Sequence, residues 1–436
     1  MIFTNPLKQK NFSFYDFGHK LFLIGIFFLA SAPLLSSIIL LPALIIGTLN
    51  NKENLLQDKW NIPFILSSIL MILSCIIQYQ NNYYLAYDYN FNLSILGLFN
   101  WLPLFWCYWG FQPYLKSKKL RKSFLFILVC GSVPLVISGL GQYFLNWYGP
   151  FKFLNGFIIF YQRPIDTNFQ GLTSFFNNQN YAGAWLSIIF YMSFAFSIVK
   201  EQIKLKKLIS IFISFLIGFS TLLTYSRNAI LSIIVFFLFF IKSHKIKVFI
   251  SIFFISIVFL LTYSAMFDNL KDKIPLAFYN KFDDLTLENF KSSPRIIIWN
   301  AVINLISEKP LFGWGASSFP LLFKSFDLTN INAQHTHNLF LDIALSYGIP
   351  SSILISCNLI LLTFKNLFIE IKMRSRHYLT NDNIFDTAWK TSTGIFLFSH
   401  LFDITYFDVR ISILCWILFS GMRNILKENS LENINR

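Results

Sequence analysis

The chain has 436 residues, of which 55% are hydrophobic and only 13% are charged, and its mean hydropathy is +0.55. Because about a quarter of the residues in a soluble domain are charged, this composition excludes a soluble globular fold and indicates an integral membrane protein. The formal net charge is +15, but the basic residues form short clusters between apolar runs. This arrangement is typical of membrane topology and argues against a nucleic-acid partner.

Apolar runs of about 20 residues predict membrane-spanning helices, because that length crosses about 30 Å of hydrocarbon. Two runs are too long for one crossing. Residues 208–241 must fold back at TYSRN (224–228), and residues 21–48 hold two prolines that favour a second hairpin. The other runs are 61–79, 94–115, 123–145, 182–199, 247–266, 338–363, 387–406 and 409–426. We therefore predict a single all-α polytopic membrane domain over residues 1–436, with about 12 transmembrane helices, or 11 if 21–48 crosses once.

The basic clusters also predict the orientation. With both termini in the cytoplasm, most of the 36 basic residues fall in cytoplasmic segments, including KSKKLRK (116–122). Two extracytoplasmic segments are then large enough to carry a site: a smaller loop at 146–181 and a large, partly helical loop at 267–337. The five cysteines all lie in apolar runs and form no CxxC pair, so neither a disulfide framework nor a thiolate metal site is expected.

Arg227 lies at the tip of the 208–241 hairpin, at or just below the outer membrane interface. An arginine there is costly unless it has a partner. It is interpreted either as a fixed cation for an anionic head group or as an anchor that touches lipid phosphate.

Arg295 begins an amphipathic helix predicted over 294–309, with Ser293 as its N-cap and Pro294 at its first position. Arg295 falls on the side opposite the polar stripe, so we expect it to face the protein and to need an anion. The stripe consists of Asn300, Asn304, Ser307 and Glu308. The alternative is an ordinary ion pair with Asp283, Asp284 or Glu288.

Two of the six histidines, His335 and His337, stand just before a helix predicted to run from Asn338 to Tyr347, where YGIP (347–350) supplies its stop. A helix N-terminus at the membrane surface attracts phosphate, which favours a functional role for His337. If the helix begins this early, the two rings should not face one site. In an extended segment both rings would share one side and could bind a metal, but a third ligand is not evident, so no metal and no cofactor are expected.

Two other polar groups stand out. Asn177, Asn178 and Asn180 precede the span at 182–199 and could bind sugar hydroxyl groups or cap the helix. Asp403 and His400 lie within the apolar run 387–406, where they could form a pair satisfied inside the bundle. Buried ionisable groups of this kind are also what a transporter uses.

Four motifs, in this order, resemble the O-antigen ligase and polymerase superfamily: GLTSFFNNQNYAG (171–183), LLTYSRNAIL (222–231), PRIIIWNAVINLISEKPLFGWGASSF (294–319) and HTHNLFLDIALSYGI (335–349). The resemblance covers about residues 160–350. It implies an inverting, metal-independent glycosyltransferase of the ligase or polymerase type. Such an enzyme moves a glycan from undecaprenyl pyrophosphate to a glycan, lipid-core or protein acceptor. The resemblance places it in the bacterial inner (plasma) membrane, as a multi-pass protein among membrane lipids, with its active site facing the periplasm.

The same resemblance assigns residue roles. His337 would be the catalytic base, and Arg227 and Arg295 would bind the pyrophosphate. Beside these roles, Asn180, Asn338 and His335 are further candidates for sugar binding or site support. The side chains suit these roles, since histidine accepts protons near neutral pH and arginine presents a fork of donors to phosphate. Ligase and polymerase cannot be separated from the sequence. The alternative function is a transporter of a small anion such as inorganic carbon, with the two arginines as its anion site.

Overall fold

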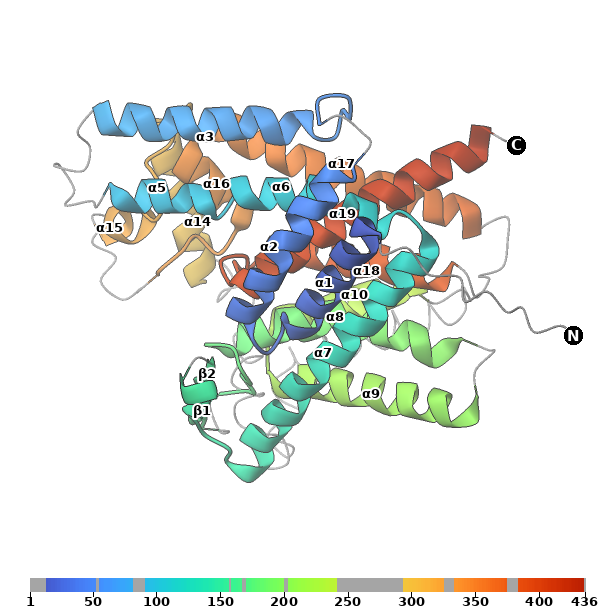
Figure 1. Cartoon of the computed structure of the whole chain (residues 1–436). Helices are drawn as coiled ribbons and strands as arrows, with labels where there is room; N and C mark the ends of the chain where they lie inside the picture. The colour runs from blue at the N-terminus through green and yellow to red at the C-terminus, as the bar shows by residue number, and fades with distance from the viewer. Residues whose placement is uncertain are drawn as a thin grey trace, which may run out of the picture.

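The computed structural model describes residues 13–51, 55–80, 91–156, 158–166, 170–199, 203–240, 293–324, 333–374 and 383–434. The described chain is mostly helical (Figure 1). Six described helices are long and apolar enough to cross a membrane: α3 (Ile62–Gln80), α7 (Lys118–Leu145), α8 (Gln179–Ile198), α9 (Lys204–Leu223), α17 (Ile349–Arg374, of which Ile349–Ile369 qualifies) and α19 (Val409–Ile434, of which Val409–Ser430 qualifies). The predicted span at 247–266 lies outside the described residues, so the total of about 12 remains a prediction.

Both predicted hairpins are present. Helices α1 (Phe14–Phe28) and α2 (Pro33–Leu49) pack along each other, and Pro33 occupies the first position of α2. Its missing N–H costs nothing there, because the first helical N–H groups have no partner within the helix. Helices α9 and α10 (Arg227–Phe240) are likewise separated by a turn at TYSRN.

Two runs predicted as single spans, 94–115 and 338–363, are instead broken, although the helix end at Tyr347 inside the second run was itself predicted from YGIP. Residues 94–115 form α5 (Asn92–Phe99), α6 (Leu102–Gly110) and the 3-10 turn η1 (Gln112–Leu115). The first break precedes Pro103, which lies in the first turn of α6 and has no N–H to donate to the carbonyl of Phe99, the last residue of α5. The second run divides at Gly348, between α16 (Leu339–Tyr347) and α17. Gly348 has φ +89°, and a Cβ there would lie 2.0 Å from the carbonyl oxygen of Leu311.

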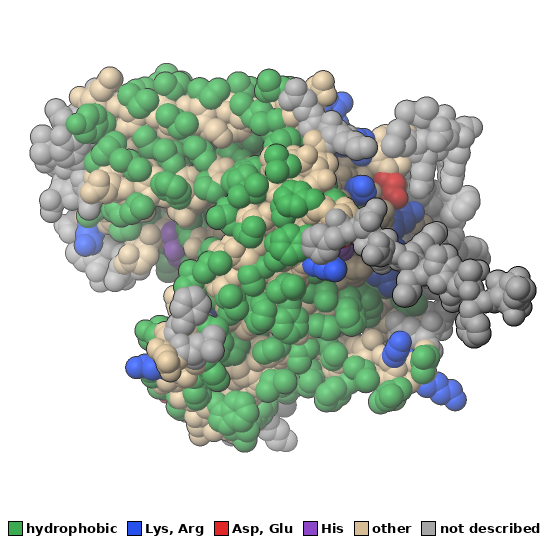
Figure 2. All heavy atoms as spheres, viewed as in Figure 1, with side chains coloured by type: hydrophobic (Ala, Val, Ile, Leu, Met, Phe, Trp, Pro, Cys, Tyr) green, Lys and Arg blue, Asp and Glu red, His purple; other side chains and the backbone are tan. Residues whose placement is uncertain are grey.

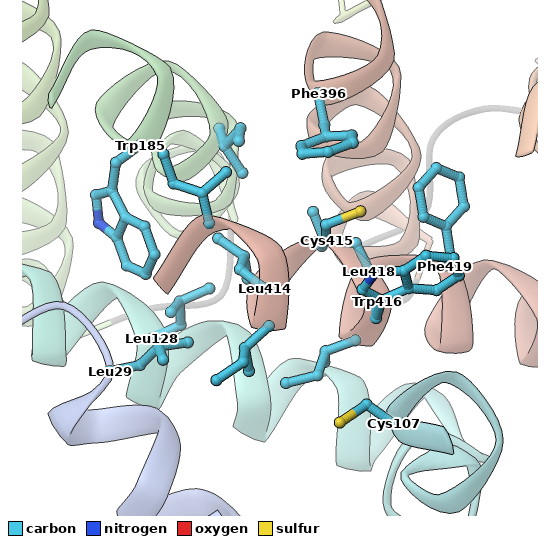
Figure 3. Packing of buried hydrophobic residues seen from close by; sticks show 14 of the residues in the cluster. Leu29, Cys107, Leu128, Trp185, Phe396, Leu414, Cys415, Trp416, Leu418 and Phe419 are labelled. Atoms are coloured by element: carbon cyan, nitrogen blue, oxygen red, sulfur yellow. The ribbon is translucent and has the colours of Figure 1, made fainter. Parts of the chain in front are cut away.

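The core is centred on α19 and α18 (Ile384–Ser399), with α7 and α8 packed around them. Trp416 and Leu414 of α19 are fully buried, and Figure 3 shows them between Trp185 of α8, Leu128 of α7 and Phe396 of α18. Large rigid side chains fill this centre, so the helix ends around it are held in fixed positions.

One end of the bundle is tied by a buried charge cluster. Arg121, fully buried at the start of α7, donates to Asp386 of α18 at 2.7 Å and to Glu428 of α19 at 2.6 Å. Tyr15, at the start of α1, donates to the Pro113 carbonyl at 2.9 Å beside the start of α7. The start of α1 and the end of α19 therefore lie at the same end, as an even number of crossings requires. Figure 2 shows Lys and Arg side chains gathered mostly toward the right of the view and hydrophobic side chains over much of the rest.

The opposite end carries the two longer connecting segments. Within 146–181, β1 (Phe151–Phe153) and β2 (Ile158–Phe160) pair antiparallel around the short turn η2 (Leu154–Gly156), with Lys152 opposite Ile159. Among the described residues, this small β-hairpin departs from the all-α prediction. Within 267–337 the described elements are α14 (Pro294–Glu308) and α15 (Phe319–Lys324); residues 267–292 and 325–332 lie outside the described residues. The predicted helix over 294–309 is thus confirmed.

Candidate active site

His337 lies in a tight turn immediately before α16, with φ +54°. Asn338 holds this turn, because its side-chain oxygen accepts from the N–H groups of Phe340 at 3.0 Å and Leu341 at 3.1 Å and so caps α16. The side-chain nitrogen Nδ2 of Asn338 donates to the carbonyl of Leu401 at 3.1 Å. The N–H of Leu339 donates to the carbonyl of His400 at 3.0 Å. The histidine turn is therefore fixed against the loop that joins α18 to α19.

That loop brings Asp403 to His337. The Nδ1 atom of His337 lies 3.1 Å from Oδ1 of Asp403, and the same oxygen accepts from the N–H of Ile404 at 2.9 Å. Oδ2 of Asp403 accepts from the side chain of Asn180, at the start of α8, at 2.8 Å. Since an ionised carboxylate only accepts, Nδ1 of His337 is the donor in this contact, and in the neutral ring the lone pair is then on Nε2. The His337 side chain is 27% exposed, so this lone pair belongs to a ring that a ligand can reach.

Asp403 is ionised despite its burial. Burial alone would raise the pKa of its carboxyl group, but the hydrogen bond from His337 opposes this effect, together with the charges of His337, His335 and Arg295. The net result is a pKa below the usual range for aspartate. A buried anion is thus maintained behind His337, and Arg295 is close enough to contribute to its stabilisation.

His335 lies against His337, which corrects the expectation that their rings would not face one site. The ring centroids are 4.2 Å apart at an interplanar angle of 64°. The left-handed backbone at His337 lets its own N–H donate to Nδ1 of His335 at 3.4 Å. Burial, then repulsion by the charge of His337, lowers the pKa of His335 to about 4, and Arg295 acts in the same direction. His335 is therefore neutral at physiological pH.

Helix α14 carries Arg295 to the same place. Its exposed residues include the predicted polar stripe, while Ile298, Ala301, Val302, Leu305 and Ile306 are buried. Arg295 is half-buried, on the side that the sequence predicted. One turn along, Trp299 Nε1 donates to the carbonyl of Thr336 at 3.0 Å and joins α14 to the histidine turn. The alternative partners of Arg295, at 283, 284 and 288, lie outside the described residues.

Arg227 is the exposed first residue of α10. The side chain of its neighbour Asn228 donates to the carbonyl of Ser399, at the end of α18, at 2.7 Å. This contact places the start of α10 beside the helix end from which the Asp403 loop departs. The structure thus joins His335, His337, Asp403 and Asn180 by direct contacts, Arg295 through its charge, and Arg227 through its neighbour.

The expected pairing of Asp403 with His400 was wrong. His400 is fully buried, and its ring nitrogens contact the carbonyl of Phe396 at 2.8 Å and the hydroxyl of Thr405 at 3.2 Å. Helix α18 ends at Ser399, so the two residues lie in a loop and do not share a helix face. Asp403 is the site residue whose role sequence reasoning missed; the available signal was a carboxylate within an otherwise apolar run.

Asp403 is a third candidate metal ligand beside His335 and His337, contrary to the expectation that none was evident. One ligand atom each of His335, His337 and Asp403 lie within 4.8 Å of one another, and two imidazoles with a carboxylate can hold Zn²⁺. However, Asn180 and the Ile404 N–H already engage both oxygens of Asp403, and the charge of Arg295 opposes a cation. The arrangement fits a proton acceptor beside an anion site better than it fits a metal centre.

Asn178, one of the three asparagines before α8, is the cap of that helix. Its side-chain oxygen accepts from the N–H groups of Asn180 at 2.9 Å and Tyr181 at 3.1 Å. The cap interpretation therefore holds for Asn178, whereas the side chain of Asn180 is directed to Asp403.

Comparison with known proteins agrees with the site. The model of a family described as O-antigen ligase matches residues 212–356, which include Arg227, Arg295, His335 and His337. The chain is also similar to a ComP-specific O-oligosaccharyltransferase of Acinetobacter baylyi, with 25% identity over 267 residues. That similarity covers 57% of this chain and 44% of the relative, so the chain spans less than half of the relative's length. The family match, over about a third of the chain, and the order of the four motifs show that this chain is similar to the O-antigen ligase superfamily.

Proposed function

We propose that this protein transfers a glycan from undecaprenyl pyrophosphate to an acceptor hydroxyl group, at the periplasmic face of the bacterial inner membrane. The observation that carries the proposal is the His337–Asp403 pair, with the charge of Arg295 beside it. Similarity to the O-antigen ligase family implies a lipid-linked glycan donor and an acceptor in the membrane. The Acinetobacter relative, named as an oligosaccharyltransferase, supports the same class of reaction.

In the proposed reaction, Nε2 of His337 accepts the proton of the acceptor hydroxyl group as its oxygen attacks the anomeric carbon. The bond from that carbon to the pyrophosphate oxygen breaks, and the pyrophosphate leaves as an anion. Asp403 holds the ring and stabilises the imidazolium that forms, as carboxylates do for catalytic histidines elsewhere. Arg227 and Arg295 bind the departing charge, and attack from the opposite face inverts the anomeric centre. Every step uses protein side chains, so no metal is required.

The proposed orientation rests on the two ends of the bundle. The starts of α7 and α9 carry lysines such as Lys118 and Lys206, while the histidine turn lies at the other end. Lys and Arg are enriched on the cytoplasmic side of membrane proteins, which supports a periplasmic site. A lipid-linked glycan displayed on that side would meet His337 directly.

The test is a transfer assay with purified protein in lipid vesicles. The donor is a labelled glycan on undecaprenyl pyrophosphate, and the acceptor is varied among a lipid core, a second lipid-linked glycan and a peptide with a hydroxyl group. Label in any acceptor supports the proposal and separates ligase from polymerase. Uptake of a labelled inorganic anion into the vesicles, without transfer to any acceptor, would overturn it in favour of the transporter alternative.

A further inference from the structure

The small β-hairpin that follows α7 presents aromatic side chains for which the proposed reaction has no use. Its register places Phe151 opposite Phe160 and Phe153 opposite Ile158. Because side chains alternate between the two faces of a strand, these four apolar side chains share one face. Phe151 and Phe153 are exposed, so the rest of the described protein leaves their edge of this face uncovered. Contiguous exposed apolar side chains of this kind indicate an interaction surface.

The position of the hairpin relative to the membrane follows from α7, which ends just before it (Figure 1). Residues 123–145 of α7 carry no charge and extend about 35 Å at 1.5 Å per residue, slightly more than the hydrocarbon thickness of about 30 Å. The basic start of α7 marks the opposite surface. Phe144 and Leu145, the last residues of α7, are exposed, as is Trp147, and tryptophan is enriched at the membrane boundary. The hairpin therefore starts in the head-group region.

The hairpin is fixed at this depth, because its base is bonded to α7. Gln162, buried just after β2, donates through Nε2 to the carbonyl of Ser138 in α7 at 2.9 Å and to the carbonyl of Trp147 at 2.8 Å. Gln142, also buried in α7, donates through Nε2 to the carbonyl of Arg163 at 2.9 Å. The side chains of the hairpin therefore keep a constant distance from the end of α7.

Basic side chains accompany the apolar ones. Lys152 lies on the opposite face of β1, Arg163 follows β2, and both are exposed. Residues 146–181 hold a single acidic side chain, that of Asp166. At a membrane surface, lysine and arginine extend to lipid phosphates while their apolar stems lie along hydrocarbon. The hairpin thus combines the two kinds of side chain that an amphipathic element uses at a lipid surface.

The hairpin also contacts the segments that support the site. The ring of Phe160 stacks on that of Phe175, with the centroids 4.3 Å apart. The carbonyl of Phe175 accepts from Arg410 at 2.9 Å, and Arg410 pairs with Asp408, in the same loop as Asp403. The depth of the hairpin is therefore linked to the height of the Asp403 loop.

We propose that the hairpin is an interfacial anchor. Phe151 and Phe153 insert among the lipids of the leaflet at the site end, and Lys152 and Arg163 lie at their phosphates. The partner is the phospholipid surface itself, because the apolar exposure continues from the end of a membrane-spanning helix into the hairpin. The anchor goes beyond the proposed function and does not depend on glycan transfer. It sets the height at which the candidate site stands over the lipid.

The test measures the accessibility of nitroxide labels on the purified full-length chain in phospholipid vesicles. Labels are attached at Phe153→Cys and Ile159→Cys, in a background that lacks Cys130 and Cys357, the two native cysteines that are not buried. Phe153 and Ile159 are 53% and 36% exposed and lie on opposite faces of one hairpin, so Ile159 is the matched control. Molecular oxygen concentrates in lipid, whereas a nickel chelate stays in water. The ratio of oxygen to nickel collisions should be severalfold higher at position 153 than at 159.

A second pair of labels guards against a label that disturbs the hairpin. Phe151→Cys should show the high ratio of position 153, and Lys152→Cys, between them, should show the low ratio of position 159. An unfolded hairpin cannot produce this alternation. Equal ratios on the two faces would overturn the anchor. So would a label at position 153 that the nickel chelate reaches freely in vesicles, because the phenylalanine face would then be open to a soluble partner.

Discussion

The proposed chemistry depends on the exposed ring of His337. Replacing His337 with Ala should lower the rate of transfer by about 10²–10⁴-fold, the usual contribution of a positioned general base. Donor binding should persist, because the variant keeps Arg227 and Arg295, the proposed pyrophosphate ligands. The measurement is single-turnover transfer on purified protein, with and without a chelator. An active His337→Ala enzyme would refute the base assignment, and strong inhibition by the chelator would instead favour the cluster of His335, His337 and Asp403 as a metal site.

Asp403 should matter for turnover more than for donor affinity. Asp403→Asn keeps the shape of the side chain but removes the anion that stabilises a protonated His337. We expect kcat to fall about 10²-fold or more while KM for the donor changes little. The control is Asp408→Asn in the same loop, whose carboxylate pairs with Arg410 at 2.5 Å and does not contact His337 in the described structure. Equal losses in the two variants would mean that Asp403 only holds the loop together.

Replacing either site arginine with lysine should lower activity, although the positive charge is kept. Arg227→Lys and Arg295→Lys keep the positive charge but lose the planar fork that matches phosphate oxygens. Each should reduce kcat/KM for the lipid-linked donor at least about tenfold, the equivalent of about one strong charged hydrogen bond. Arg163→Lys, at an exposed arginine of the 146–181 segment, is the control. Near-normal activity in both site variants would favour the interfacial-anchor interpretation.

His335 gives a pH dependence of stability. Its pKa is about 4 in the folded protein, below the ordinary value near 6.5, so the unfolded chain binds a proton first as the pH falls. Its contribution is therefore complete above about pH 6.5, declines between about pH 6.5 and 4, and changes no further below. The loss is at most about 3 kcal/mol. In His335→Gln, the thermal-unfolding midpoint should depend less on pH over this range than in the wild type. The same pH dependence in both proteins would show that His335 is not held neutral.

At the scale of elements, helix boundaries that carry a proline or a polar turn could be predicted from the sequence. Pro33 and the polar TYSRN turn marked both hairpins, and Pro294 marked the start of α14. The helix end before Gly348 was predicted from the YGIP motif (347–350), whereas the apolar window over 338–363 did not record it; a Cβ at Gly348 would meet the carbonyl oxygen of Leu311 at 2.0 Å. The partnership of His337 with Asp403 was missed for a related reason. The residues are 66 positions apart, and hydropathy alone assigned Asp403 to a membrane span.

Helix ends, rather than helix interiors, supply the site. Asn180 comes from the start of α8, Arg227 from the start of α10 and Arg295 from the start of α14. Each start carries the positive end of its helix dipole, which suits a pyrophosphate better than a cation. The candidate arginines could be predicted because arginine in apolar surroundings is rare, whereas their convergence required the packed helices.

At the scale of the whole molecule, orientation decides whether the site meets its donor. Single cysteines at Tyr161 and Lys324, both exposed at the site end, should react in intact cells with a thiol reagent that cannot cross the membrane. Cysteines at Lys119 and Lys207, exposed at the other end, should react only after the cells are opened. The background should lack Cys357, the exposed native cysteine among the described residues. Labelling at Lys119 in intact cells would reverse the topology.

The hydrogen bonds that Asp403 makes to His337 and Asn180 have a consequence for inheritance. The family's recognisable domain, 212–356, contains the histidine, but Asn180 precedes it and Asp403 follows it. A recombination event that exchanged only this domain between two relatives would join one parent's base to the other parent's carboxylate. Such a chimera should work only if both parents place an aspartate in the loop before the last helix. The unit on which selection acts is therefore longer than the segment that the family model matches.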